Sequence, residues 1–293
     1  MASSSRIPGS VRGRRTAAWT VVAVVALLVI AVLGDLLAAS RAEHRLARAL
    51  LASPTLDYEP NVMFSGFPFL PSAAGGEYSL VHISAGGAPI EGCADRGHCT
   101  ATLDAGLHDA VLGTVWEMSA ASPISFDRLT AETRIDSVNL GRLLNIVDLY
   151  LNTPAPEGKV GGGGPGGTLT ERTDGILLSG TVPLPGSPAS DGEYPPSADE
   201  YRFPKVRVSV AARVELVDGR IRIEATDFYT GPEEHFDADV PAEFGSHVLK
   251  LFSTTLPILP LAWDTPATST FSRGSDLILA GERSAGTVEP RGF

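Results

Sequence analysis

The chain has 293 residues, a formal net charge of −11 at pH 7 and 43% hydrophobic residues, which is typical of a folded protein and excludes a disordered or fibrous one. Residues 16–293 keep 19 of the 23 basic residues and all 34 acidic ones, a net charge of about −15, and so acidic a surface argues against a nucleic-acid partner. The ~260 residues after the N-terminal segment are enough for one large domain or two small ones.

An uncharged run, TAAWTVVAVVALLVIAVL, extends from Thr16 to Leu33. Four arginines precede it, namely Arg6, Arg12, Arg14 and Arg15. As a helix the run would be about 27 Å long, close to the ~30 Å hydrocarbon core of a bilayer. We predict a basic cytoplasmic tail (1–15), a single transmembrane signal anchor (16–34), an extracytoplasmic domain (35–283) and a C-terminal tail (284–293), because basic residues mark the cytoplasmic side of a span. A cleaved signal peptide and a buried core helix are the alternatives.

The segment DLLAASRAEHRLARALLAS, directly after this run, has apolar residues three or four positions apart. They are Leu36, Ala39, Ala42, Leu46, Ala49 and Leu50. This spacing predicts an amphipathic helix. The helix would lie on the membrane surface or pack on the domain, and packing is the commoner outcome.

The two cysteines, Cys93 and Cys99, lie in EGCADRGHC. Outside the cytoplasm a disulfide that closes this short loop is the first interpretation. Two free thiols and a metal site are the alternatives, but the six histidines show no cluster at ligand spacing, so we expect no metal.

Alternation of apolar and polar residues predicts strands in most of the remaining chain. The longest signal is a hairpin, with Val206 to Leu216 and Ile221 to Ala225 on either side of Asp218-Gly219. Shorter signals lie at Glu77 to Ser84, Ile124 to Val138, Leu169 to Val182 and Asp276 to Gly281.

Two further segments have helical spacing: Leu140, Leu143, Leu144, Val147 and Leu151 in one, and Val240, Phe244, Val248, Leu251 and Phe252 in the other. A few helices against a large antiparallel sheet, an α+β fold, is therefore expected. Two stretches rich in Pro, Gly and Ser, Pro154 to Gly167 and Pro183 to Tyr201, read as insertions within one domain.

Motifs for catalysis are scarce. Gly161, Gly163 and Gly166 satisfy G-x-G-x-x-G, but no strand precedes them and no helix follows, so a flexible linker is the better interpretation. No pair of carboxylates stands out as an acid and base, and His82 lies in a predicted strand. We predict no catalytic residue and no cofactor.

Two blocks combine apolar side chains with prolines. Gly66 and Pro68 bend the first block, and Pro257 and Pro260 forbid a regular helix in the second. These blocks form either a core plug or the wall of an elongated cavity for an acyl chain. The cavity interpretation predicts these lipid-binding residues: Val62, Phe64, Phe67, Phe69, Leu70, Val81, Ile83, Leu143, Leu144, Val147, Leu256, Ile258, Leu259, Leu261 and Trp263.

The apolar run, the Arg41-Ala42-Glu43 helix, GFPFL (Gly66–Leu70) with GEYSLVHI, and LPILPLAW with DLILAG together resemble the LmeA family of actinobacterial cell-envelope proteins. The likeness spans roughly Thr16 to Gly281, and the cysteine loop and the two insertions depart from it. It implies a tubular lipid-binding fold: a rolled antiparallel sheet packed with a few long amphipathic helices around an apolar cavity.

The same resemblance implies a non-enzymatic protein of the cell envelope whose partner is a phospholipid or related acyl lipid. It further implies a role in lipoglycan (lipomannan) maintenance or lipid transfer. An enzyme acting on envelope glycolipid and a ligand-free structural anchor are the alternatives.

Overall fold

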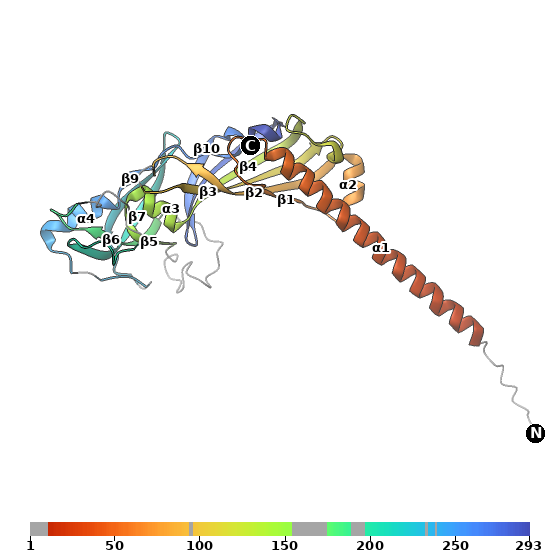
Figure 1. Ribbon diagram of the computed structural model, residues 1–293, viewed down its shortest axis with the longest axis horizontal. Coiled ribbons are helices and arrows are strands. Elements are labelled where there is room, and N and C mark those ends of the chain that lie inside the picture. The colour runs from red at the N-terminus through yellow and green to blue at the C-terminus, as the bar shows by residue number, and fades with distance from the viewer. Residues whose placement is uncertain (1–10, 94–95, 154–174, 189–196, 232–233, 238) are drawn as a thin grey trace, which may run out of the picture.

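The computed structural model describes residues 11–93, 96–153, 175–188, 197–231, 234–237 and 239–293. Its body is elongated, and helix α1 (Val11–Leu50) projects from one end (Figure 1). The described strands form two antiparallel sheets, one of six and one of five strands. The predicted α+β fold with antiparallel strands after an N-terminal apolar helix is confirmed, with the strands divided between two sheets that are not closed.

The six-stranded sheet has the order β1-β2-β3-β4-β11-β10. It therefore combines the first four strands of the chain with the last two. Their bounds are β1 (Asn61–Phe64), β2 (Glu77–Ile90), β3 (Cys99–Leu112), β4 (Ile124–Ile135), β10 (Ala267–Arg273) and β11 (Asp276–Val288).

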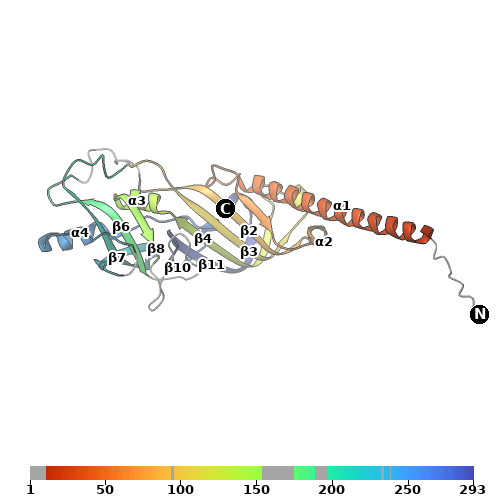
Figure 2. The same ribbon diagram turned by 90° about the horizontal axis from the view of Figure 1, so that it is seen from below.

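The five-stranded sheet has the order β5-β6-β7-β8-β9, and its strands follow one another in the chain. Their bounds are β5 (Val147–Asn152), β6 (Gly175–Pro183), β7 (Lys205–Val217), β8 (Arg220–Phe228) and β9 (Thr254–Thr255). The two sheets succeed one another along the long axis, with the six-stranded sheet beside α1 (Figure 2).

Helix α1 changes character along its length. The apolar side chains from Trp19 to Leu33 are exposed, and this is the described helix long and apolar enough to cross a membrane. Farther along, Ala42, Leu46 and Leu50 are buried in the core. The predicted amphipathic segment is thus the second half of α1, and it packs on the domain as expected.

The other helices are short: α2 (Phe69–Gly75), α3 (Ser137–Leu144) and α4 (Gly245–Leu251). Short 3₁₀ turns accompany them: η1 (Val115–Glu117), η2 (Ala242–Phe244), η3 (Ala262–Asp264) and η4 (Pro290–Gly292). The helical spacing seen at 240–252 therefore corresponds to η2 and α4, with Pro241 directly before the first turn.

One predicted helix ends early. Asp136 caps α3 by accepting a 2.7 Å hydrogen bond from the backbone N–H of Asn139, and β4 ends at the preceding residue, Ile135. Asn145 then adopts φ 59, a left-handed conformation that ends the helix. The prediction that the helix continues through Val147 to Leu151 is wrong, because these residues form β5 and pair with β6.

The predicted hairpin is confirmed as β7 and β8. Asp218 (φ 51) and Gly219 (φ 74) both have positive φ, as a two-residue turn between twisted strands requires. Pro154 to Gly167, which includes the three glycines of the G-x-G-x-x-G match, and the centre of Pro183 to Tyr201 lie outside the described residues.

The last ten residues pack on the domain, although the sequence indicated a tail there. Strand β11 continues to Val288, and Phe293 is buried. The hydroxyl of Ser53 donates a 2.5 Å hydrogen bond to the carbonyl of Phe293, so the end of the chain is held against the segment that follows α1.

Candidate functional site

The inner face of the six-stranded sheet is apolar and carries a row of small residues. Ala105 of β3 lies opposite Ile83 of β2 and opposite Ala131 of β4, and Ala131 in turn lies opposite Gly281 of β11. Ile83, Ala105 and Ala131 are buried. A side chain at Gly281 would collide with the carbonyl of Pro266, which directly precedes the paired strand β10, so the backbone is closely packed at this end of the row.

The second proline-containing block belongs to that cover. Leu259, Leu261 and Trp263 are buried, and the hydroxyl of Thr133 on β4 donates a hydrogen bond to the carbonyl of Pro260. The indole N–H of Trp263 donates a 2.9 Å hydrogen bond to the carbonyl of Glu289. The extended backbone predicted from the two prolines is thus an apolar strap across the inner face, which we call the strap (residues 256–263).

The first block divides into a buried and an exposed part. Phe64, Phe69 and Tyr78 pack together, with ring centroids 4.5–6.0 Å apart, and Trp116 meets Phe69 edge-on. The Tyr78 hydroxyl is buried with no hydrogen-bond partner among the described residues, and burial raises its pKa. This aromatic cluster packs the end of the interior next to α1.

The fifteen residues predicted to bind lipid differ in exposure. Phe67, Leu70 and Ile258 are exposed, and Leu143 and Leu144 are half-buried against the core. The remaining ten are buried: Val62, Phe64, Phe69, Val81, Ile83, Val147, Leu256, Leu259, Leu261 and Trp263. Their contact with lipid stays a prediction.

The edge of β2 is partly open. Strand β1 pairs only with residues Val81 to Ser84, so Ala85 to Ile90 have no neighbouring strand on that side in the described part of the chain. A cleft of about 730 Å³ lies at this open edge. The residues that line it include Tyr58, Gly87, Pro89, Ile90, Gly92, Thr100 and the two cysteines. Its volume falls within the usual range for sites that hold a small molecule.

The cleft leads toward the junction of the two sheets. Gly92 at its wall lies beside Leu143 of α3 and Pro257 of the strap, each within contact of the position that a β-carbon would take. The buried Ile90 and the strap residues Leu256 and Leu259 belong to the same continuous core. The cleft wall is therefore continuous with the apolar interior.

Cys93 and Cys99 form a disulfide, with an S–S distance of 2.03 Å, which confirms the first interpretation of the pair. The disulfide loop separates the large cleft from a second one of about 310 Å³, lined in part by Arg96 and Arg142. Arg96 and Arg142 donate 2.8 Å hydrogen bonds to the carbonyls of Gly92 and His98 respectively. Neither guanidinium pairs with a carboxylate within the described residues, so both keep donors for an anion.

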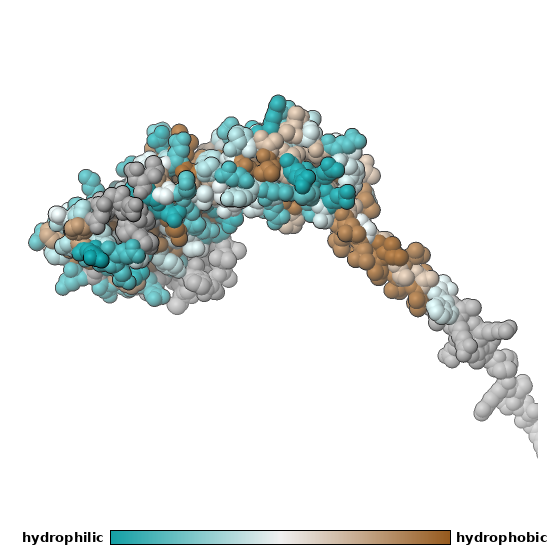
Figure 3. All heavy atoms as spheres, viewed as in Figure 1, coloured by the Kyte–Doolittle hydropathy of each residue, from teal (hydrophilic) through white to brown (hydrophobic). Residues whose placement is uncertain are grey.

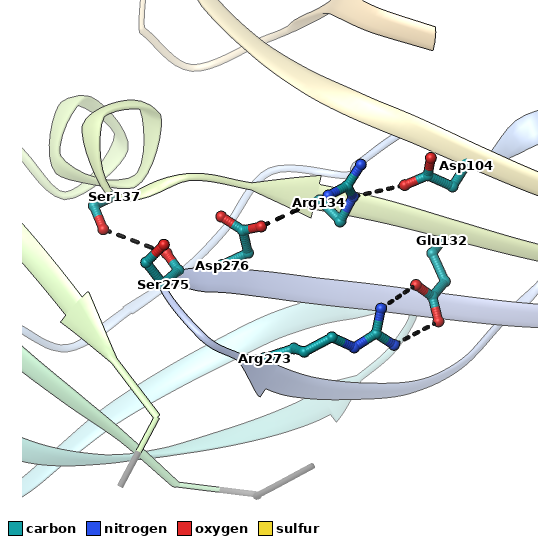
Figure 4. Close-up of polar contacts among 7 residues, drawn as sticks. All are labelled: Asp104, Glu132, Arg134, Ser137, Arg273, Ser275 and Asp276. Carbon is teal, nitrogen blue, oxygen red and sulfur yellow. Dashed lines mark hydrogen bonds and ion pairs between the residues drawn. The ribbon is translucent and has the colours of Figure 1, made fainter. Parts of the chain in front are cut away.

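The outer face of the same sheet is polar (Figure 4). The guanidinium of Arg273 forms two 3.0 Å hydrogen bonds with Glu132, and Arg134 lies 2.6 Å from Asp104. Arg134 also lies 3.9 Å from Asp276, whose pKa is raised, mainly because burial disfavours its charged form. These pairs organise the outside of the sheet, and their alternation with buried residues on β4 places the apolar surface on the inside.

No group of three His, Cys, Asp or Glu side chains with metal-binding geometry occurs among the residues that the structure describes. The sequence interpretation missed Asp35, Tyr58, Arg96 and Arg142. Asp35 did leave a signal, because it is the first charged residue after the apolar run. Arg96 and Arg142 left no signal in the sequence, because the absence of a paired carboxylate among the described residues is visible only in three dimensions.

A family model described as LmeA-like phospholipid-binding matches residues 33–282 of the chain. No curated protein and no solved structure matches it. The matched region takes in the second half of α1, the strap and both sheets as far as Glu282 of β11.

Proposed function

Because a match over most of its length makes this chain a member of the LmeA-like phospholipid-binding family, we propose that it is an extracytoplasmic, membrane-anchored carrier that holds one phospholipid. The acyl chains lie in the apolar interior between the six-stranded sheet and its cover, and α1 spans the membrane with the arginine-rich end in the cytoplasm. The protein binds its lipid without catalysing a reaction.

This proposal rests on the way in which the apolar interior is enclosed by a sheet on one side and by other segments on the other. Its floor is the inner face of a sheet, whereas its cover consists of the second half of α1 and the strap, which are not strands of that sheet. Segments that cover a sheet through side-chain packing separate from it more easily than hydrogen-bonded strands. Movement of the strap would open space along the row of small residues.

The open edge of β2 is the proposed entrance. A lipid that enters the cleft at Tyr58 and Gly92 would pass Leu143 on its way to the core. Val81, Ile83, Leu259, Leu261 and Trp263 would then contact the acyl chains, whereas Phe67, Leu70 and Ile258 point away from the interior and would not.

The phosphate of the headgroup would lie beside the disulfide loop, at the second, smaller cleft that Arg96 and Arg142 line. Arg96 and Arg142 have donors without carboxylate partners, and guanidinium groups bind phosphate through charge-assisted hydrogen bonds. The described lining of this smaller cleft holds the two arginines and one acidic residue, Asp148, and a net positive charge suits an anionic group.

Storage or transfer of phospholipid in the cell envelope follows from this design, because a bound lipid is shielded from water. Support of lipoglycan (lipomannan) maintenance would follow if the released lipid supplies that process. No described residues form a recognisable set of nucleophile, base and acid, so an enzyme acting on envelope glycolipid remains the less favoured alternative.

Filling the entrance tests the proposal. Thr100 lines the cleft, so Thr100→Trp should lower the amount of phospholipid that the full chain binds. Ser125→Trp is the matched control, since Ser125 is exposed on the outer face of the neighbouring strand β4. Both variants should keep the wild-type melting temperature, and normal phospholipid binding by Thr100→Trp would contradict the proposed entrance.

A further inference from the structure

Two large apolar side chains are exposed at the end of the body from which α1 emerges. Phe67 is 67% exposed and Leu70 is 46% exposed, and both lie at the start of α2. Figure 1 and Figure 2 both place α2 beside α1 at this end. Trp116, which is 37% exposed, belongs to the same region through its contact with Phe69.

A buried carboxylate fixes this region to α1. Asp35 is only 5% exposed, and its two oxygens accept hydrogen bonds of 2.8 and 2.7 Å from the backbone N–H groups of Phe69 and Leu70. A buried carboxylate that accepts two hydrogen bonds strongly constrains the position of the donor groups. The start of α2 therefore keeps a defined height along α1.

This position along α1 coincides with the end of the apolar run. Leu33 is the last residue of the run, and Asp35 follows after a helical rise of about 3 Å. A bilayer has roughly 5–7 Å of polar interface on each side of its hydrocarbon core. If α1 spans the membrane, Phe67 and Leu70 lie at the level of the lipid headgroups.

The chemistry of the segment agrees with this position. Residues 61–76 contain no charged side chain, although the domain as a whole is acidic. Apolar and aromatic side chains are favoured at membrane interfaces, whereas acidic ones are repelled by anionic lipids. In Figure 3 the exposed apolar surface of α1 is brown up to the point where it enters the mostly hydrophilic body.

We propose that Phe67, Leu70 and Trp116 form a membrane foot, which inserts into the interface of the leaflet that α1 crosses. The proposal rests on the membrane-spanning part of the proposed function. The foot and α1 give the body two attachments to the bilayer, so its long axis points away from the membrane. The five-stranded sheet is then the distal end, as the opposite positions of α2 and β9 in Figure 1 show.

The orientation has a consequence for the lipid. The foot holds the aromatic cluster of Phe64, Phe69 and Tyr78 against the membrane, and this end of the interior is packed. The cleft at the open edge of β2 lies beyond it, next to α3 and the strap. A phospholipid bound there is presented away from the leaflet, as a carrier requires.

The test measures the depth of single side chains. The full chain with Phe67→Cys carries an environment-sensitive fluorophore on the new cysteine and is reconstituted in nanodiscs of zwitterionic phospholipid. Part of that lipid bears a quencher at the headgroup. The matched control is Ile258→Cys, because Ile258 is equally exposed (68%) but lies in the strap. Leu70→Cys serves as a second site in the foot.

We expect quenching at positions 67 and 70 that is several-fold stronger than at position 258. Equal quenching at all three positions would overturn the foot. Phospholipid retained by the same purified proteins is measured separately after delipidation and reloading. Strong quenching without retained lipid would contradict the proposed binding function but keep the foot, whereas retained lipid with equal quenching would do the reverse.

Discussion

The carboxylate of Asp35 accepts a 2.8 Å hydrogen bond from the backbone N–H of Phe69, thirty-four residues farther along the chain. This contact connects the end of the apolar run of α1 with the first turn of α2. It binds the helix that we place in the membrane to the sheet domain, and it sets the position of the exposed Phe67 and Leu70.

Asp35→Ala should destabilise the domain by about 1–3 kcal/mol, because it leaves two backbone donors without their acceptor. Asp35→Asn should lose less, since its amide oxygen can still accept one of the two hydrogen bonds. The urea midpoint of the full chain in detergent measures both effects. Glu215→Ala, at an exposed position on β7, is the control and should leave the midpoint unchanged. An Asp35→Ala midpoint equal to that of the control would show that the contact contributes nothing.

Phe69→Ala and Phe67→Ala should differ sharply although they lie two residues apart. Phe69 packs against Phe64, Tyr78 and Trp116, so its truncation should cost roughly 3–5 kcal/mol. Phe67 is exposed, and its truncation should change stability by less than about 0.5 kcal/mol. Similar losses for the two variants, measured by denaturant unfolding, would contradict the division of the first apolar block into core and foot.

Removal of the disulfide should lower stability by about 2 kcal/mol, because the Cys93–Cys99 bridge closes a short loop. The paired variant Cys93→Ser/Cys99→Ser, compared with the wild type by thermal melting, measures this loss. The same variant should bind less phospholipid, since both cysteines line the cleft. If it binds the same amount, the loop is not part of the entrance.

Asp276→Asn should stabilise the domain at pH 7. Burial raises the pKa of the Asp276 carboxyl, with Arg134 as the main opposing influence. The folded state therefore holds this proton more tightly than the unfolded chain, and the unfolding free energy falls as pH rises above the ordinary carboxyl pKa of about 3.9. Melting temperatures of the two proteins should converge below that pH. A variant less stable than the wild type at pH 7 would mean that the ion pair with Arg134 outweighs desolvation.

Local sequence patterns were sufficient to predict those helices and strands that do not depend on a distant partner. The β7–β8 hairpin followed from strict alternation around Asp218-Gly219, and the second half of α1 followed from its helical spacing. The helix predicted at 140–151 ended early because Leu149 and Leu151 are spaced for a strand as well, and pairing with β6 decides between the two. Only tertiary structure supplies that partner.

The sequence also identified the two apolar blocks but not their different roles. Nothing in the order of residues tells Phe67 from Phe69, because the hydrogen bond that the backbone N–H of Phe69 donates to the distant Asp35 fixes the chain at this point. Similarly, Leu259 and Ile258 are neighbours, yet one faces the core and the other solvent. Arg96 lies in the disulfide loop and Arg142 lies in α3, far along the chain, so the sequence alone could not show that both line one cleft.

Mass spectrometry of organic extracts from the purified full chain tests the central claim most directly. After purification in a detergent that strips loosely bound lipid, the wild type should retain phospholipid in a fixed proportion to protein, and Thr100→Trp should retain less than Ser125→Trp. A wild-type protein that carries no extractable phospholipid and binds none when it is added would contradict the claim that this domain is a phospholipid carrier.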